Sequence, residues 1–116
     1  MNAKRGDRVA PPPGEGHWDV RYGNSDAVAG WEELCRQVPA NTRRAWETLC
    51  TDPRRRNDRQ HPLKGKDLAS GTFKGKVLPR WQLEVTGGGR IWYLIDDEER
   101  RVILVHAGAG HPKATD

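Results

Sequence analysis

The chain has 116 residues and a formal net charge of +4 at neutral pH, and only 34% of its residues are hydrophobic. This length predicts one domain with a modest core. The sequence has no long apolar run that could span a membrane, and the stretch after Met1 lacks the apolar region of a signal peptide. Two cysteines do not make a disulfide framework, and no nearby pair has zinc-site spacing. We therefore expect a cytoplasmic protein without a metal or other cofactor.

The positive charge is concentrated in one segment of the chain. Residues 53–80 contain nine lysines and arginines against two acidic residues, whereas residues 25–52 and 81–116 are each slightly acidic. Such clustering is typical of proteins that bind a polyanion, most simply a nucleic acid. A solvated connecting loop, whose cations serve only solubility, explains the same composition.

The N-terminal part of the chain divides at about residue 17. Residues 1–16 contain Pro11-Pro12-Pro13-Gly14 and almost nothing that could be buried, so they predict a disordered or polyproline-like basic arm outside the domain. From residue 17 the pattern changes, because Trp18, Val20 and Tyr22 alternate with polar residues. This alternation predicts a first strand and places the folded domain at residues 17–116.

Two helices are predicted next. Ser25 or Asp26 can cap the first helix, and the apolar residues that follow recur at helical spacing up to Val38. The second helix is predicted to reach about Cys50 and to end at Asp52-Pro53, because proline disfavours helical geometry in the residue before it. Cys35 and Cys50 both fall on the apolar stripes and are predicted to be buried small side chains. The close linkage of the helices predicts an antiparallel hairpin.

The remaining chain predicts a three-stranded meander. Residues 81–86 alternate between apolar and polar, and the glycines at 87–89 can take the positive φ values of a tight turn. Residues 90–95 are apolar on both faces, which predicts a central strand, and residues 102–105 predict the last one. The order β-α-α-β-β-β predicts an α+β domain with a helical hairpin on one face of a mostly antiparallel four-stranded sheet.

This succession resembles the RelE/ParE superfamily of toxins from bacterial type II toxin–antitoxin systems. Leu63-Lys64-Gly65 resembles the family's Leu-Lys/Arg-Gly element, and Arg90-Ile91-Trp92-Tyr93 with Asp96 resembles its Arg-Leu-Val-Tyr strand. The resemblance covers residues 17–116. It implies a ribosome-dependent, metal-free endoribonuclease, a hydrolase that inhibits translation, with mRNA on the ribosome and ribosomal RNA as contacts and a cognate antitoxin as its protein partner. A ParE-like gyrase inhibitor and a non-catalytic nucleic-acid-binding module of the same fold are the alternatives.

The family mechanism assigns roles to particular residues. Attack of a ribose 2′-OH on the adjacent phosphate needs a base, positive charge for the transition state and an acid for the leaving oxygen. The resemblance gives the charge to Arg90 with Lys64, the base to His61, where YoeB-type members carry a glutamate, and the acid to His111. Glu84 stands where the family usually places lysine or arginine. It is either a substitute base or an outward charge on a strand.

Several residues keep two interpretations. Arg90 either holds the scissile phosphate with its guanidinium or is used within the fold, stacked on a tryptophan or paired with Glu84. Trp92 can stack on a base if it is exposed, and belongs to the core if it is covered. Alternation places His106 on the same face as Val102 and Leu104, where it either reaches the site or is an ordinary sheet histidine. The residues predicted to contact phosphate groups are Lys66, Lys74, Lys76, Arg80 and Lys113.

Two departures from the family stand in the sequence. The chain ends in Lys113-Ala114-Thr115-Asp116 and lacks the family's frequent C-terminal tyrosine. The strand that carries Glu84 also lacks the usual basic residues. The histidines favour the YoeB type over the gyrase inhibitors, which have no such pair of base and acid.

Overall fold

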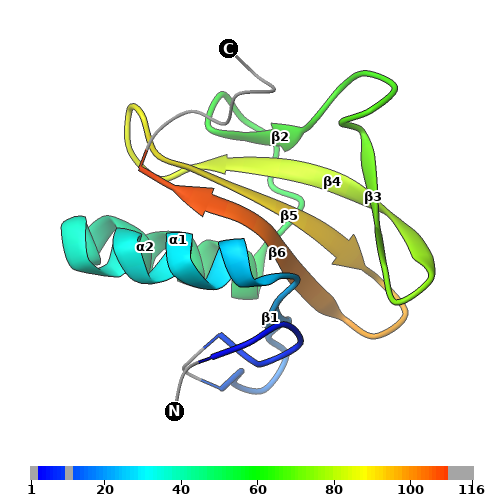
Figure 1. Cartoon of the computed structure of the whole chain (residues 1–116), viewed down its shortest axis with the longest axis horizontal. Helices are drawn as coiled ribbons and strands as arrows, with labels where there is room; N and C mark the ends of the chain where they lie inside the picture. The colour runs from blue at the N-terminus through cyan, green and yellow to red at the C-terminus, as the bar shows by residue number, and fades with distance from the viewer. Residues whose placement is uncertain (1–2, 10–11, 110–116) are drawn as a thin grey trace.

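The computed structural model describes residues 3–9 and 12–109, and in these residues two helices pack on one face of a sheet (Figure 1). The elements are β1 (Asp19–Tyr22), α1 (Ser25–Gln37), α2 (Pro39–Thr51), β2 (Gln60–Pro62), β3 (Ser70–Phe73), β4 (Lys76–Glu84), β5 (Arg90–Asp96) and β6 (Arg101–Gly108). The six strands form a sheet of order β1-β6-β5-β4-β2, with β3 paired to β4. The β1–β6 pair is parallel. The β2–β4, β3–β4, β4–β5 and β5–β6 pairs are antiparallel. The α+β class and the helical pair are confirmed.

The prediction of four strands is wrong, because the basic segment contributes strands as well, whereas the sheet is mostly antiparallel as predicted. β2 pairs with β4, and β3 forms a hairpin with the first half of β4. This hairpin turns at Lys74 and Gly75, whose φ values are 50° and 82°. Two consecutive positive φ values are typical of a type I′ turn, whose twist suits a two-residue hairpin. Residues 53–80 are therefore part of the sheet and not only a connecting loop.

Residues 3–9 pack against the domain, although their composition predicted an arm outside it. The Val9 N–H donates to the Val20 carbonyl oxygen at 2.8 Å, and the Val9 side chain is fully buried in the main core. This segment thus covers the outer side of β1. Residues 10–11, where the proline run begins, lie outside the described residues.

The first helix is capped by Asn24 and not by Ser25 or Asp26. The Asn24 Oδ1 accepts a hydrogen bond from the Ala27 N–H at 2.8 Å, which satisfies one of the orphan donors of the first turn. Its Nδ2 donates to the Val105 carbonyl oxygen at 3.0 Å. One side chain therefore starts α1 and also ties it to β6.

α1 lies unusually close to β6 at Gly30. A Cβ atom built on Gly30 would stand 1.7 Å from the carbonyl oxygen of Ala107 and 2.5 Å from its carbonyl carbon. Only a residue without a side chain fits this contact. The close approach sets the depth at which Trp31 and Leu34 of α1 enter the core.

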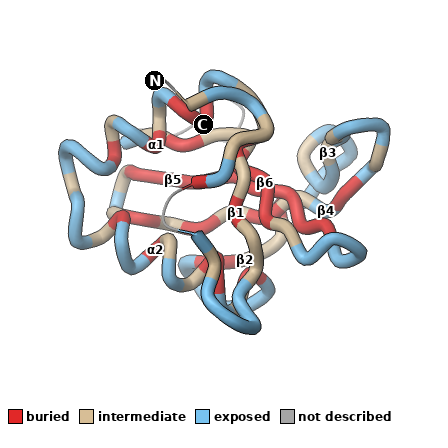
Figure 2. Tube along the Cα trace, turned by 90° about the horizontal axis from the view of Figure 1, so that it is seen from below, coloured by how far each residue is buried: buried red, intermediate tan, exposed pale blue. Residues whose placement is uncertain are grey.

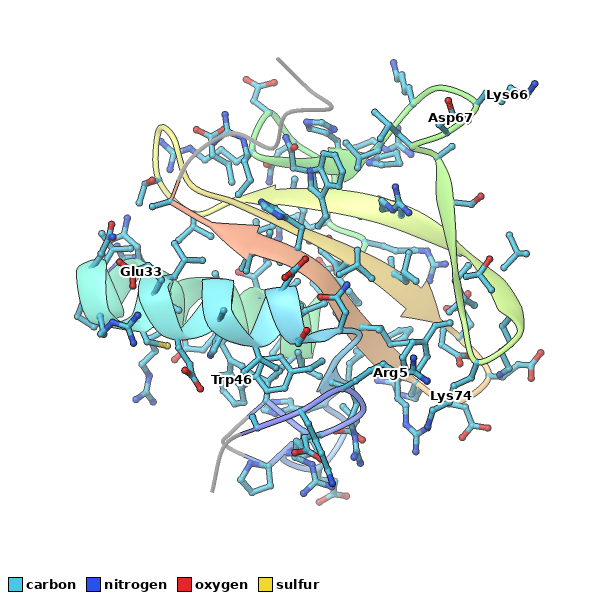
Figure 3. The ribbon with its side chains drawn as sticks, viewed as in Figure 1. Arg5, Glu33, Trp46, Lys66, Asp67 and Lys74 are labelled. Atoms are coloured by element: carbon cyan, nitrogen blue, oxygen red, sulfur yellow. The ribbon has the colours of Figure 1, made fainter. Side chains whose placement is uncertain are left out.

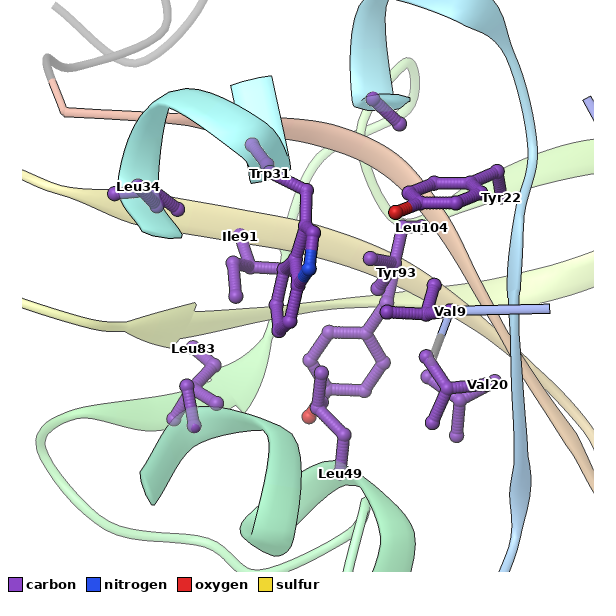
Figure 4. Packing of buried hydrophobic residues seen from close by; sticks show 14 of the residues in the cluster. Val9, Val20, Tyr22, Trp31, Leu34, Leu49, Leu83, Ile91, Tyr93 and Leu104 are labelled. Carbon is purple, nitrogen blue, oxygen red and sulfur yellow. The ribbon is translucent and has the colours of Figure 1, made fainter. Parts of the chain in front are cut away.

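β5 is buried along its whole length, as the apolar run predicted (Figure 2). Ile91, Tyr93 and Ile95 belong to the main core between sheet and helices, where Leu34 and Leu49 pack with them (Figure 4). The alternate residues of β5 point to the opposite face of the sheet. The strand thus has a helix-covered face and a second face on which the candidate site lies.

The Tyr93 hydroxyl is the main polar group inside this core. It donates to the Pro53 carbonyl oxygen at 2.7 Å and accepts from the Gln60 Nε2 at 3.0 Å. Burial raises the pKa of Tyr93, so the hydroxyl stays protonated. These two bonds join the end of α2 and the start of β2 to the central strand, and they satisfy a buried polar group.

The two cysteines differ from each other in burial. Cys50 is buried, as predicted, and burial raises the pKa of its thiol to about 11. Cys35 is exposed, which corrects the prediction. The neighbouring Leu34 takes the core position of that helical turn.

The close approach of α1 to β6 predicts a reversal of the usual effect of glycine in a helix. Replacing a glycine inside a helix by alanine ordinarily stabilises a protein by about 1 kcal/mol. We expect Gly30→Ala to lower the free energy of unfolding by about 3 kcal/mol, because the new methyl group must push the helix away from Ala107. Urea denaturation followed by circular dichroism measures the change.

Ala29→Gly is the matched control, since Ala29 is exposed on the same helix. It should cost only about 1 kcal/mol through helix propensity. A Gly30→Ala protein as stable as the parent would contradict the close contact.

Candidate functional site

The face of the sheet turned away from the helices has two unlike halves. The half towards the β5–β6 turn carries a second apolar cluster of Leu78, Leu94 and Ile103, with Phe73 and Val105 against it. The half towards the β4–β5 turn carries polar and aromatic side chains. We call this second region the polar half of the open face; it consists of His61, Gln82, Glu84, Arg90, Trp92 and His106.

Four of these residues form one row across the sheet. His61 on β2 is opposite Gln82 on β4, Gln82 is opposite Trp92 on β5, and Trp92 is opposite His106 on β6. Directly opposed residues of antiparallel strands point to the same face, with Cβ atoms about 5 Å apart. The row therefore places two histidines that are far apart in the sequence on the same face, with β4 and β5 between them.

His106 joins this row because of an irregularity in β6. Trp92 is opposite His106, but the next residue, Tyr93, is opposite Leu104, so Val105 is an extra residue in β6. Such a bulge reverses the alternation of the strand beyond it. The prediction that His106 shares the face of Val102 and Leu104 is therefore wrong, because those two residues pack in the main core.

Trp92 is covered and leaves little ring surface for a base. It is 7% exposed, its Nε1 donates to the Gln82 Oε1 at 2.9 Å, and the Arg80 Cζ lies 5.8 Å from its ring centroid. The His106 ring packs at 5.8 Å with an interplanar angle of 60°. Of the two alternatives for Trp92, the structure therefore agrees with the covered, structural role.

His106 is a neutral member of the row. Burial lowers the pKa of His106 below the ordinary 6.5, and the carboxylate of Asp26 opposes this shift in part. Its Nε2 is buried and has no hydrogen-bond partner among the described residues. A neutral imidazole suits packing against Trp92 better than it suits proton donation at neutral pH.

The His61 ring contacts the backbone of the next residue. Its Nδ1 lies 3.1 Å from the Pro62 carbonyl oxygen. A carbonyl oxygen can only accept, so Nδ1 must carry the proton of that bond. The Nε2 of a neutral His61 is then unprotonated, which is the state that a general base needs.

A basin of about 550 Å³ adjoins His61 at the edge of β2. Its lining residues are Arg56, Asn57, Asp58, His61, Pro62, Leu63 and Lys64. Arg56 and Lys64 are both exposed and bring two positive charges to the basin against the single carboxylate of Asp58. We call this the β2 basin; its charge and the acceptor atom of His61 suit an anion that also carries a hydroxyl group.

Arg90 is used within the fold. Its Nη1 donates to the carbonyl oxygens of Thr86, Gly87 and Gly89, each at 3.2 Å, and lies 3.9 Å from the Glu84 carboxylate. The residue is 9% exposed. Of the two roles considered for Arg90, the one within the fold is present, since it pairs with Glu84. A phosphate would have to be bound by the Nε and Nη2 atoms of Arg90.

Arg90 also explains how the β4–β5 turn is held. The glycines at 87–89 are predicted from the sequence to take the positive φ values of a tight turn. That prediction is wrong, because none of the three has a φ in the left-handed range. The Thr86 Oγ1 accepts from the Gly89 N–H at 2.8 Å, and the arginine binds the turn's carbonyl groups. A Cβ on Gly89 would stand 2.8 Å from that same oxygen, so close packing requires glycine there.

The predicted phosphate contacts are spread over the molecule. Lys64 and Lys66 lie in the loop after β2, near the β2 basin, whereas Lys74 lies at the β3–β4 turn at another end of the molecule (Figure 3). Lys76 pairs with Asp96 at 3.2 Å and with Glu98 at 3.3 Å, and the bond to Asp96 raises its pKa.

Arg80 is placed between Trp92 and β3. Its Nη1 donates to the Asp67 carbonyl oxygen at 3.5 Å, and a Cβ on Gly71 would lie only 2.7 Å from its Nη2. Part of the basic surplus of the segment therefore stabilises the fold. His111 and Lys113, the remaining predicted site residues, lie outside the described residues.

Sequence reasoning missed two residues of this region. Gln82 was predicted only as an outward residue of its strand, and Arg56 only as part of the basic cluster. Their importance comes from Trp92 and His61, which are brought near them by strand pairing. In the sequence, the only signal for Gln82 was its polar character between two apolar residues, Trp81 and Leu83.

Within residues 3–9 and 12–109 no group of three or more histidine, cysteine, aspartate or glutamate side chains is arranged to hold a metal ion. No helix of the described chain is long and apolar enough to cross a membrane. No protein-family model, no curated protein and no solved structure matches the chain at a significant level.

The hydrogen bonds of Arg90 predict a structural effect of its loss. Arg90→Met keeps the length of the side chain but removes the three bonds to the turn. We expect the free energy of unfolding to fall by about 2 kcal/mol, since three hydrogen bonds from a charged, largely buried donor to the turn are lost. Urea denaturation checks this, with Arg59→Met as the control at an exposed position. Equal stability of the two variants would show that Arg90 does not hold the turn.

The burial of His106 predicts a dependence of stability on pH. Its pKa is lower in the folded state than in the unfolded chain, so the unfolded state takes up the proton first as the pH falls below about 6.5. This histidine therefore makes the folded state less stable at pH 5.5 than at pH 7.5. His106→Gln should reduce that loss, and an unchanged pH dependence in urea denaturation would contradict the effect.

Proposed function

We propose that the protein is a RelE/ParE-type toxin that cleaves mRNA on the ribosome. The observation that carries the proposal is the placement of His61: it lies on the polar half of the open face, beside the β2 basin and its two cations, with its Nδ1 3.1 Å from the Pro62 carbonyl oxygen. The order of elements also supports it, since a strand, a helical pair, a basic segment and a meander follow one another as in the family the sequence resembles.

The chemistry follows from the groups present. The Nε2 of His61 removes the proton of a ribose 2′-OH, whose oxygen then attacks the adjacent phosphorus. The bond from phosphorus to the 5′-oxygen breaks, and that oxygen takes up a proton from an acid. Lys64 and Arg56 stabilise the charge on the phosphoryl oxygens. The products are a 2′,3′-cyclic phosphate and a 5′-hydroxyl.

The proposal changes two of the roles that the resemblance implied. Arg90 contributes first by holding the β4–β5 turn, and Glu84 balances its charge. His106 is a poor acid at neutral pH because its pKa is lowered. The general acid therefore remains assigned to His111.

A cognate antitoxin would neutralise such a toxin most directly by covering the polar half of the open face. An acidic segment of the antitoxin would find Arg56 and Lys64 at the β2 basin. The helical hairpin is the other surface on which it can bind.

A non-catalytic nucleic-acid-binding module is the second candidate, and one observation favours it. Arg90, the family's phosphate-holding residue, is tied to the carbonyl groups of its own turn. Such a module would use the cations of the β2 basin for affinity and would not need the base at His61.

The test is induced expression in a bacterial host, followed by primer extension on an abundant mRNA. We expect growth arrest and discrete cleavages within the coding region. His61→Asn should reduce cleavage at least about 100-fold, which is the usual contribution of a general base. His17→Asn is the matched control, because His17 lies on the exposed loop before β1.

The other outcomes identify the competing functions. Equal cleavage by the His61→Asn protein would remove His61 from the site. Growth arrest with DNA damage and intact mRNA would identify a gyrase inhibitor. Soluble protein that binds RNA but neither arrests growth nor cleaves would identify the non-catalytic module.

A further inference from the structure

Gln82 stands between His61, the proposed general base, and Trp92. It is opposite His61 on one side and opposite Trp92 on the other, in the middle of the row across the sheet. Its side chain is half-buried and makes a single hydrogen bond within the described part of the chain, from the Trp92 Nε1. A polar residue in this position has a donor and an acceptor to place, and only the acceptor is used.

The bond to Trp92 fixes which way the amide of Gln82 points. An indole N–H can only donate, so the atom that it meets must be the carbonyl oxygen Oε1 of Gln82, at 2.9 Å. The Nε2 of the same planar amide must then point away from Trp92. The amide of Gln82 cannot rotate by 180°, because its N–H groups would then face the N–H group of Trp92.

We propose that the Gln82 Nε2 is a binding group for a non-bridging oxygen of the RNA phosphate that is attacked at His61. This inference rests on the proposed function and adds to it a residue that contacts the substrate. His61 and Gln82 are directly opposed, so their Cβ atoms are about 5 Å apart, a separation that one nucleotide linkage can span. Arg56 and Lys64 line the β2 basin together with His61 and supply positive charge there.

Together, the side chains of His61 and Gln82 match the hydrogen-bonding groups of a ribonucleotide. His61 offers an acceptor at Nε2, and Gln82 offers donors at its own Nε2. A phosphodiester with a neighbouring 2′-OH provides the matching acceptor and donor. A carboxylate of an acidic peptide provides acceptors only, and its lone pairs would face that of His61.

Two substitutions separate binding of phosphate from support of Trp92. Gln82→Glu keeps an oxygen that accepts from the Trp92 indole, but it has no N–H to donate. Gln82→Met has nearly the same shape, adds no charge, and loses both functions. The NMR resonance of the Trp92 indole N–H reports whether the bond to position 82 remains, and urea denaturation reports stability.

The probe is a ten-nucleotide single-stranded oligonucleotide built from 2′-deoxyribose, which presents the same phosphates but cannot be cleaved by 2′-OH attack. Affinity is measured by fluorescence anisotropy at low salt and at about 0.3 M salt, where a Debye length of about 6 Å screens the charge that glutamate adds. We expect both variants to bind about tenfold to hundredfold more weakly than the parent at both salt concentrations, because a donor to a charged group is lost.

A purely structural role gives a different pattern. The Gln82→Glu protein would then keep the indole resonance and bind like the parent at the higher salt, and this result would overturn the inference. Failure of the parent itself to bind the oligonucleotide would overturn it as well.

Cleavage is measured separately on an RNA of the same sequence. A parent protein that binds and cleaves nothing, with weakened binding in both variants, would leave Gln82 as a phosphate-binding group and contradict only the catalytic part of the proposed function. Weakened binding together with loss of the indole resonance in the glutamate variant would show that Gln82 acts through Trp92, and this result would overturn the direct contact with phosphate.

Discussion

The burial of β5 on both faces is the constraint on which the rest of the structure depends. Its residues alternate between the helix-covered core, where Tyr93 lies, and the open face, where Trp92 lies. Neighbouring strands must pair with it in register, and the helices must come close enough to seal its first face. The contact between Gly30 and Ala107 is one result of this packing.

The same strand also divides the second face. Leu94 belongs to the apolar cluster beneath the β3–β4 hairpin, whereas Trp92 and Arg90 belong to the polar half. Because the apolar cluster covers one end of this face, the polar side chains lie at the other end and beside the β2 basin. The proposed site is therefore a consequence of how one central strand is covered.

Much of the positive charge is used before any ligand arrives. Arg54 binds Asp97 through two hydrogen bonds, which lower the pKa of that carboxylate, and Lys76 binds Asp96. Exposed pairs of this kind contribute little to stability. These ion pairs do, however, neutralise cations that a polyanion would otherwise contact. The surface around His61 is therefore a better candidate for binding a polyanion than the whole of residues 53–80.

The sequence predicted those elements that local rules determine. Helical spacing and the proline at 53 defined the helices, and an apolar run defined β5. The parallel pairing of β1 with β6 and the packing of residues 3–9 depend on contacts between distant parts of the chain. The hairpin at Lys74 was missed because few apolar residues flank its turn.

The site was less predictable than the fold for similar reasons. A single extra residue at Val105 moves His106 to the other face, and periodicity alone does not reveal a bulge. The direction of Arg90 is set by carbonyl groups that converge only when the turn has formed. Gln82 gained its role from Trp92, ten positions away on the next strand.

The central claim is that RNA meets the polar half of the open face and the β2 basin. Amide NMR shifts, measured while a single-stranded 2′-deoxy oligonucleotide is added, test it most directly. The account predicts the largest changes at residues 56–66 and 80–84, with the exposed faces of α1 and α2 unchanged. Changes centred on the helices, or no change at any concentration that keeps the protein soluble, would contradict it.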